Sequence, residues 1–121
     1  MTGENIVDNC LESSYDISLL LSQAHLETHF GTSSRNVFGI VGQRHSHPDE
    51  YVPHYITLMT SKYIIERTPE QLIRSNFSME NNRRVKYAEN PNYGREIRNI
   101  RKNIIENTDI HNIWLSMLDI R

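Results

Sequence analysis

The sequence has few of the features that mark stapled, secreted or membrane-spanning proteins. Its single cysteine, Cys10, excludes an internal disulfide and fits a reducing compartment. No apolar run approaches the roughly 20 residues that a membrane-spanning helix needs, so we expect no membrane partner. The start, Met1-Thr2-Gly3-Glu4, lacks the basic and apolar character of a signal peptide. These absences predict a cytoplasmic protein, or a nuclear one if the source is eukaryotic or viral.

Glycine and proline are also scarce, at five and four residues. No linker rich in glycine, proline or serine divides the chain, and no repeat or low-complexity tract occurs. A length of 121 residues therefore predicts one domain, spanning 1–121, that can bury a core of its own. No glycine-rich phosphate loop and no Gly-x-Ser-x-Gly motif occurs, which excludes the common enzyme classes that use them. We expect a non-enzymatic protein without a cofactor.

Isoleucine and asparagine are abundant, and the apolar residues recur mostly with helical spacing. The abundance is typical of AT-rich genomes such as those of viruses, phages and parasites. The spacing predicts an all-α fold of five to seven short helices, with at most one short strand near 37–41. Residues 78–94 form the most polar segment, which could hold a short helix near 79–89 or be a mobile arm. The other expected helices cover about 4–12, 16–30, a stretch ending near 67, a short stretch from 69, 95–107 and 110–118.

Charge is unevenly distributed along the chain. Residues 1–60 hold two cations against seven acids, for a net charge of −5, and residues 61–121 hold eleven against eight, for +3. Between Arg83 and Lys102 seven cations face two acids, which gives a local charge of +5. A dense basic segment can bind a polyanion even when the whole chain is slightly acidic.

This basic segment predicts a small helical regulator that binds nucleic acid. Arginine and lysine neutralise phosphates, and tyrosine rings can stack on bases. A helix-turn-helix can be drawn through 68–88, with its second helix starting at Ser78. A solvated helix face explains the same charges about equally well. The candidate nucleic-acid-binding residues are Arg83, Arg84, Lys86, Tyr87, Tyr93, Arg95, Arg98, Arg101 and Lys102.

The last helix supports an alternative function, a protein-interaction or inhibitor module that self-associates or binds a partner protein. Its apolar residues follow the cleanest amphipathic pattern in the chain, with spacings of three and four residues. The helix must therefore dock on the core or on a partner. The candidate interface residues are Ile110, Trp114, Met117 and Leu118.

Histidines suggest a third and weaker hypothesis, a His-dependent zinc hydrolase. Five of the six lie within 25–54, and His25 and His29 are spaced to lie on one helix face. The stretch from Gly42 to Pro48 resembles the Gly-x-x-His-Ser-His-Pro segment of JAMM-type zinc isopeptidases. That family continues with a serine and a zinc-ligating aspartate, where this chain has Tyr55 and Leu58. Because the third ligand is missing, we interpret the match as chance and predict no metal site.

Overall fold

The computed structural model describes residues 3–28, 38, 45, 47–63, 77–80, 83–86 and 92–120. The described part contains five α-helices, which confirms the predicted helical fold class. They are joined by two short helical turns and one two-stranded hairpin. In chain order the elements are α1 (Gly3–Ser13), α2 (Ile17–Thr28), the 3₁₀ turn η1 (Pro48–Glu50), α3 (Tyr51–Leu58), the π-helical turn η2 (Met59–Tyr63), β1 (Phe77–Glu80), β2 (Arg83–Lys86), α5 (Tyr93–Asn107) and α6 (Ile110–Ile120).

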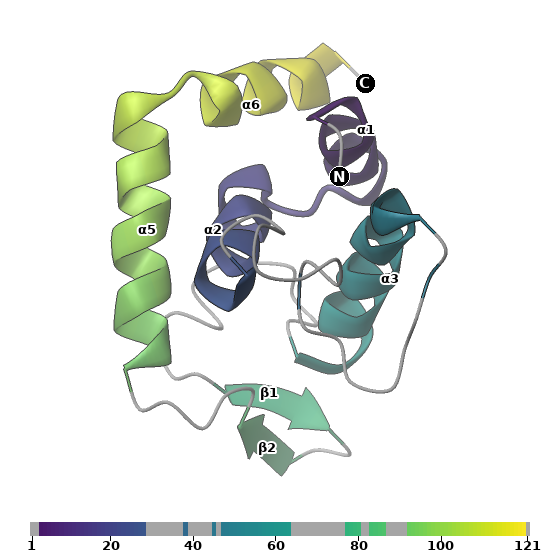
Figure 1. Cartoon of the computed structure of the whole chain (residues 1–121), viewed down its shortest axis with the longest axis vertical. Coiled ribbons are helices and arrows are strands. Elements are labelled where there is room, and N and C mark those ends of the chain that lie inside the picture. Colours follow the sequence, from purple (N-terminus) through teal and green to yellow (C-terminus); the bar gives the residue numbers. More distant parts are fainter. Residues whose placement is uncertain are drawn as a thin grey trace.

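Helix α2 lies at the centre of the molecule, as Figure 1 shows. Helix α5 packs along one side of it, while α1 and α3 contact each other on the opposite side. Helix α6 crosses the top and contacts α1, α2 and α5. The hairpin lies at the other end of the molecule, near the start of α5. The last helix therefore closes the bundle at the end opposite the hairpin.

One apolar core joins all five helices. Helix α2 is the most deeply buried, because its apolar residues surround the helix instead of forming one stripe. Cys10 is fully buried on the inward face of α1, beside Ile6 one turn earlier. The core residues are Ile6, Cys10, Tyr15, Ile17, Leu19, Leu20, Ala24, Phe38, Tyr51, Val52, Tyr55, Ile56, Met59, Tyr93, Ile97 and Trp114.

A tight corner separates α1 from α2. Ser14 has a φ of 60°, the left-handed conformation that commonly follows the last residue of a helix. Asp16 then caps α2, because its Oδ1 accepts the backbone N–H of Leu19 at 2.8 Å. Ser13 and Ser14 also precede α2, but the aspartate is the residue whose side chain caps it.

Helix α3 accommodates a proline near its start. Pro53 is its third residue and therefore lies in the first turn. Backbone N–H groups in the first turn have no acceptor within the helix, so the N–H that proline lacks is not needed there. Proline therefore does not break the helix. Its inward face carries Val52 and Ile56, and Met59 continues that face into η2; all three are buried.

The helix expected near 79–89 is wrong, and so is the helix-turn-helix that needs a second helix from Ser78. Strands β1 and β2 pair antiparallel, with Phe77 opposite Lys86 and Glu80 opposite Arg83. This register leaves only Asn81 and Asn82 between the paired ends, and asparagine is favoured in such two-residue connections. The few apolar residues of this segment cannot support a helix face, so hairpin pairing satisfies the backbone instead.

Most of the expected strand at 37–41 lies outside the described residues. Phe38 is described, and its buried ring stacks on Tyr55 with ring centroids 4.2 Å apart and planes at 6°. The described helices include none long and apolar enough to cross a membrane.

Candidate functional site

A buried polar network fixes α5 and α6 against α2. The Arg101 guanidinium donates from Nη2 to Asp16 Oδ2 at 2.9 Å and from Nε to Asp16 Oδ1 at 3.4 Å. Their side chains are only 21% and 10% exposed, so the pair is largely desolvated. The same carboxylate caps α2, which means that one side chain holds the start of α2 and the middle of α5 together.

Helix α6 joins this network through its first two turns. His111 Nδ1 lies 2.7 Å from Ser18 Oγ on α2 and 3.9 Å from Asp16 Oδ1. The Trp114 indole donates from Nε1 to the Cys10 carbonyl oxygen on α1 at 3.1 Å. These contacts bury one side of α6 and so determine which residues its other side presents to solvent.

Cys10 is a structural thiol in this network. Burial, with a smaller contribution from the Asp16 charge, raises the pKa of the Cys10 thiol to about 12. A thiol with so high a pKa is almost entirely neutral near pH 7, and the thiolate is the nucleophilic form. The structure therefore gives Cys10 a packing role.

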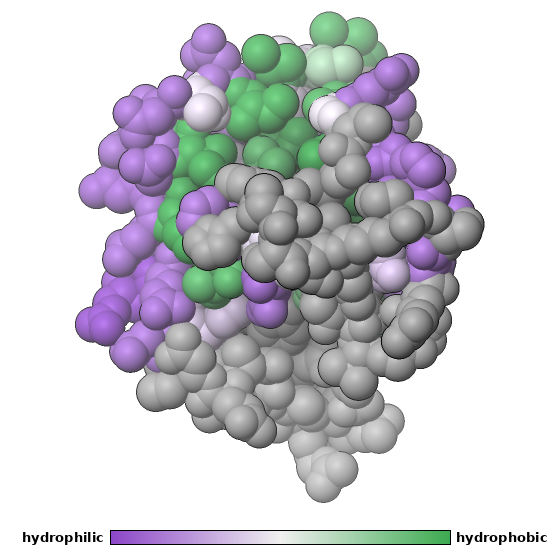
Figure 2. Space-filling model, in the orientation of Figure 1, coloured by the Kyte–Doolittle hydropathy of each residue, from purple (hydrophilic) through white to green (hydrophobic). Residues whose placement is uncertain are grey.

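The solvent-exposed part of α6 carries an unusual number of large apolar side chains. The described residues include four large exposed hydrophobic side chains, and all four belong to this helix: Ile113 at 51%, Leu115 at 43%, Met117 at 39% and Ile120 at 85% exposure. Figure 2 shows apolar residues gathered at the α6 end of the molecule. Ile113, Met117 and Ile120 are spaced by four and three residues and share one helix face. We call these three residues the α6 stripe.

The interface residues predicted from the sequence of α6 divide between the core and the surface. Trp114 is buried in the protein's own core, and Ile110 and Leu118 pack against that core. Met117 is exposed, and it lies in the α6 stripe. Sequence reasoning missed Ile113 and Ile120 as surface residues. The available signal was an apolar arc on α6 that is wider than one buried face requires.

The basic residues of α5 divide in a similar way. Arg95, Arg98 and Lys102 are exposed, and their spacing places them on one face. Arg101 instead pairs with Asp16, and Tyr93 is only 2% exposed, so its ring offers no face for stacking on a base.

Nearby groups engage two of these three cations, and one of those groups is acidic. Lys102 Nζ lies 3.8 Å from Glu106 Oε1, one turn along the helix. Arg95 Nη2 donates to Asn92 Oδ1 at 3.0 Å. The exposed face of α5 thus carries three cations and one acid, a net charge of +2.

Arg83, Arg84 and Lys86, the three basic residues ahead of α5, lie on strand β2. The pairing register sets Arg83 opposite Glu80. Tyr87 lies outside the described residues.

Two histidines and a glutamate form a chain of contacts near η1 and α3, and a third histidine lies beside it. His45 Nε2 lies 2.9 Å from His54 Nδ1, while His45 Nδ1 lies 3.3 Å from Glu50 Oε2. His47 turns to Asp49, whose backbone N–H donates to its Nδ1 at 3.1 Å. His54 and Glu50 therefore meet opposite nitrogens of one imidazole and do not converge on a common point.

His45, one of the two histidines in the stretch that resembles the zinc isopeptidases, has both ring nitrogens engaged in these contacts. Within the described part of the molecule no group of three or more histidine, cysteine or acidic side chains could hold a metal ion. His25 lies in α2, and its expected partner His29 lies outside the described residues.

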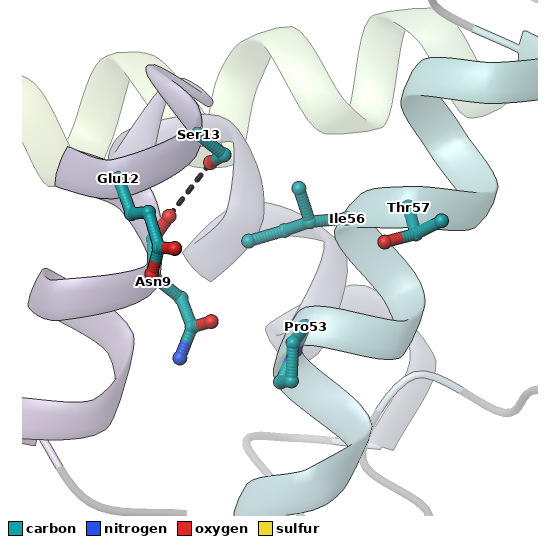
Figure 3. A pocket seen from close by; sticks show the side chains of 6 residues that line it. All are labelled: Asn9, Glu12, Ser13, Pro53, Ile56 and Thr57. Atoms are coloured by element: carbon teal, nitrogen blue, oxygen red, sulfur yellow. Dashed lines mark hydrogen bonds between the residues drawn. The ribbon is translucent and has the colours of Figure 1, made fainter.

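A shallow hollow of about 340 Å³ lies between α1 and α3. In Figure 3, Asn9 and Glu12 of α1 face Pro53 and Ile56 of α3 across it. Ser13 donates from Oγ to the Asn9 carbonyl oxygen at 2.7 Å, which ties one edge of the hollow to the helix backbone. Its single carboxylate and mixed lining define no particular ligand.

The described residues thus offer three candidate surfaces: the α6 stripe, the basic face of α5 and the histidine chain. Only the α6 stripe exposes side chains that proteins ordinarily bury. Comparison of the chain with protein-family models, with curated proteins and with solved structures finds no match.

Proposed function

We propose that this protein is a helical protein-interaction module and that the α6 stripe is its contact surface. The observation that carries the proposal is the exposure of Ile113, Met117 and Ile120 on one face of one helix. Single exposed apolar residues are ordinary, but clusters of them mark protein-binding sites. Large apolar side chains that leave water on binding each contribute about 1.5 to 3 kcal/mol when fully buried.

The way α6 is held supports this role. Trp114 and His111 fix the helix to α1 and α2, so the stripe is presented on a rigid element before any partner arrives. A preorganised surface loses little conformational entropy on binding. The role needs neither a cofactor nor a catalytic residue. A cytoplasmic or nuclear location suits it, because the buried free thiol of Cys10 is compatible with a reducing compartment.

Thiol labelling tests whether the stripe is covered. Cys10 is buried and neutral, so an engineered cysteine is the only reactive thiol. We expect Met117→Cys to react with a maleimide more slowly in an extract of the source cells, or in concentrated purified protein, than in dilute purified protein. The matched control is Asn112→Cys, which is exposed on the polar side of α6. Its rate should stay the same in all three conditions.

Equal rates for the two cysteines in every condition would overturn the proposed function, because a bound partner must slow a reagent at the stripe. Protection at both positions would indicate a contact that is centred elsewhere on α6.

Nucleic-acid binding is the second candidate function, favoured by the exposure of Arg95, Arg98 and Lys102 on one face of α5. Replacing all three with glutamate should abolish retention on a short duplex at moderate salt. The matched control is Arg101→Gln, which removes a cation already paired with Asp16 and should leave retention unchanged if the variant remains folded. Unchanged retention of the triple variant would eliminate this candidate.

A further inference from the structure

We infer that the occupant of the α6 stripe is a second copy of this chain, whose α6 packs antiparallel to the first across a two-fold axis. The inference rests on the proposed function and names the partner. Three observations carry it: the charge of α6, the spacing of the stripe and the size of the surface.

The charge of α6 selects an uncharged counterpart. Asp119 is the one acidic or basic side chain within the helix, and His111 turns inward to Ser18. The polar side carries neutral groups such as Asn112 and Ser116. A strongly charged partner helix would find no complementary charge on α6 beyond Asp119, whereas a second α6 meets the stripe with an equally neutral helix.

The spacing of the stripe is self-complementary when the two helices run in opposite directions. Ile113, Met117 and Ile120 alternate four and three residues, the spacing of a seam between packed helices. An antiparallel two-fold arrangement places Ile113 opposite Ile120 of the second copy and brings the two Met117 side chains together near the axis. Asp119 lies on the polar side of the helix with Asn112 and Ser116, away from the stripe, so no like charges from α6 meet across the seam. Such a contact closes on itself and forms a dimer.

The size of the surface sets the strength of the contact. A helix of 11 residues is roughly 16 Å long, so one helix pair buries less than the ~800 Å² per partner of a standard stable interface. We therefore expect a dissociation constant on the order of micromolar or weaker, and a dimer that dissociates on dilution.

The first test measures molecular mass against concentration, by sedimentation equilibrium from 5 µM to 1 mM. The mass should rise from that of one chain toward that of two. The double variant Ile113→Asn with Ile120→Asn should remain at the mass of one chain throughout. Both side chains are exposed, so circular dichroism should show an unchanged fold. The matched control is Leu115→Asn, an exposed apolar residue outside the stripe, which should dimerise as the natural chain does.

The second test determines the relative direction of the two α6 helices by cross-linking with a short bifunctional maleimide. Met117→Cys should be cross-linked into a dimer, and a mixture of Ile113→Cys with Ile120→Cys should be cross-linked between the two variants. Ile113→Cys alone should give little product, because its two cysteines lie at opposite ends of the seam. Efficient cross-linking of Ile113→Cys to itself, with none between the two variants in the mixture, would indicate parallel packing and overturn the antiparallel pair.

The outcomes separate this inference from the proposed function. A single-chain mass at every concentration, with Met117→Cys protected only in the cell extract, would overturn the second copy and leave a different protein as the partner. A single-chain mass with no protection in any condition would overturn both. Dimerisation that survives the double variant would place the contact outside the α6 stripe and also overturn the inference.

Discussion

At the scale of single residues, Arg101 differs from the other cations of α5 because its guanidinium meets a carboxylate from another helix. Arg98, three residues earlier, is exposed, while Arg101 is paired with Asp16 and largely buried. A buried charge that loses its partner remains desolvated without compensation. The two arginines lie three residues apart on the same helix but have different roles.

Removing the carboxylate should be costly. We expect Asp16→Ala to lower the free energy of unfolding by about 3 kcal/mol, because it leaves Arg101 unpaired and removes the cap of α2. Arg98→Ala, the exposed control, should change it by less than about 0.5 kcal/mol. Urea denaturation measures both values. Equal effects of the two substitutions would show that the Asp16–Arg101 pair contributes nothing specific to stability.

Cys10 gives the protein a pH dependence at the alkaline end. Its pKa is raised by burial from 9.0 to about 12 in the folded state, so the unfolded chain loses this proton first as the pH rises. The contribution of the neutral thiol is fully present below pH 9 and is lost as the pH rises toward 12. The free energy of unfolding should fall in this window by up to about 1.4 kcal/mol per pH unit from this group.

The check compares the natural chain with Cys10→Ala by urea denaturation between pH 8 and pH 10.5. The alanine variant should begin less stable, because it leaves a cavity, and should show a shallower decline with pH. Parallel declines would contradict the link between Cys10 and alkaline stability.

At the scale of elements, α6 carries an apolar arc that is wider than the protein's core can cover. Trp114 and His111 face the protein, while Ile113, Met117 and Ile120 face solvent. An apolar residue of α6 therefore contributes to stability or to association according to its position around the helix. This asymmetry is a direct consequence of how the helix docks.

Substitutions at the buried and at the exposed residues of α6 should have different effects on the stability of the folded chain. Trp114→Ala should lower the free energy of unfolding by about 3 to 5 kcal/mol, through lost packing and a lost hydrogen bond to the Cys10 carbonyl. Ile113→Ala should cost less than about 1 kcal/mol at a protein concentration that keeps the chain monomeric. Urea denaturation followed by far-ultraviolet circular dichroism checks both. Comparable losses would mean that Ile113 is part of the core.

At the scale of the whole molecule, the bundle presents its apolar surface at one end and its hairpin at the other (Figure 1). A surface of this kind couples stability to concentration, because a second copy binds the folded chain and not the unfolded one. The melting temperature should therefore rise with protein concentration. The double variant Ile113→Asn with Ile120→Asn should melt at one temperature regardless of concentration. Differential scanning calorimetry at 20 µM and 500 µM measures the difference, and a constant melting temperature for the natural chain would contradict a folded dimer.

The sequence predicted the helices whose apolar spacing is regular. The expected ranges 4–12, 95–107 and 110–118 agree closely with α1, α5 and α6, because a 3.6-residue period and its boundary residues are local properties. The spacing of apolar residues did not predict the hairpin. Few apolar residues occur there, and backbone pairing between two short segments decides the structure.

The sequence by itself determined that the chain folds as helices, that its charge is concentrated between Arg83 and Lys102, and that α6 is amphipathic. Only the tertiary structure decided which members of these sets are available to a partner. It paired Arg101 with Asp16, eighty-five positions away, and buried Tyr93 and Trp114. Side-chain exposure depends on which distant residues fold against it, and the pattern of a single helix does not contain that information. The docking of Trp114 against Cys10 is what turns Ile113, Met117 and Ile120 outward and makes them a surface.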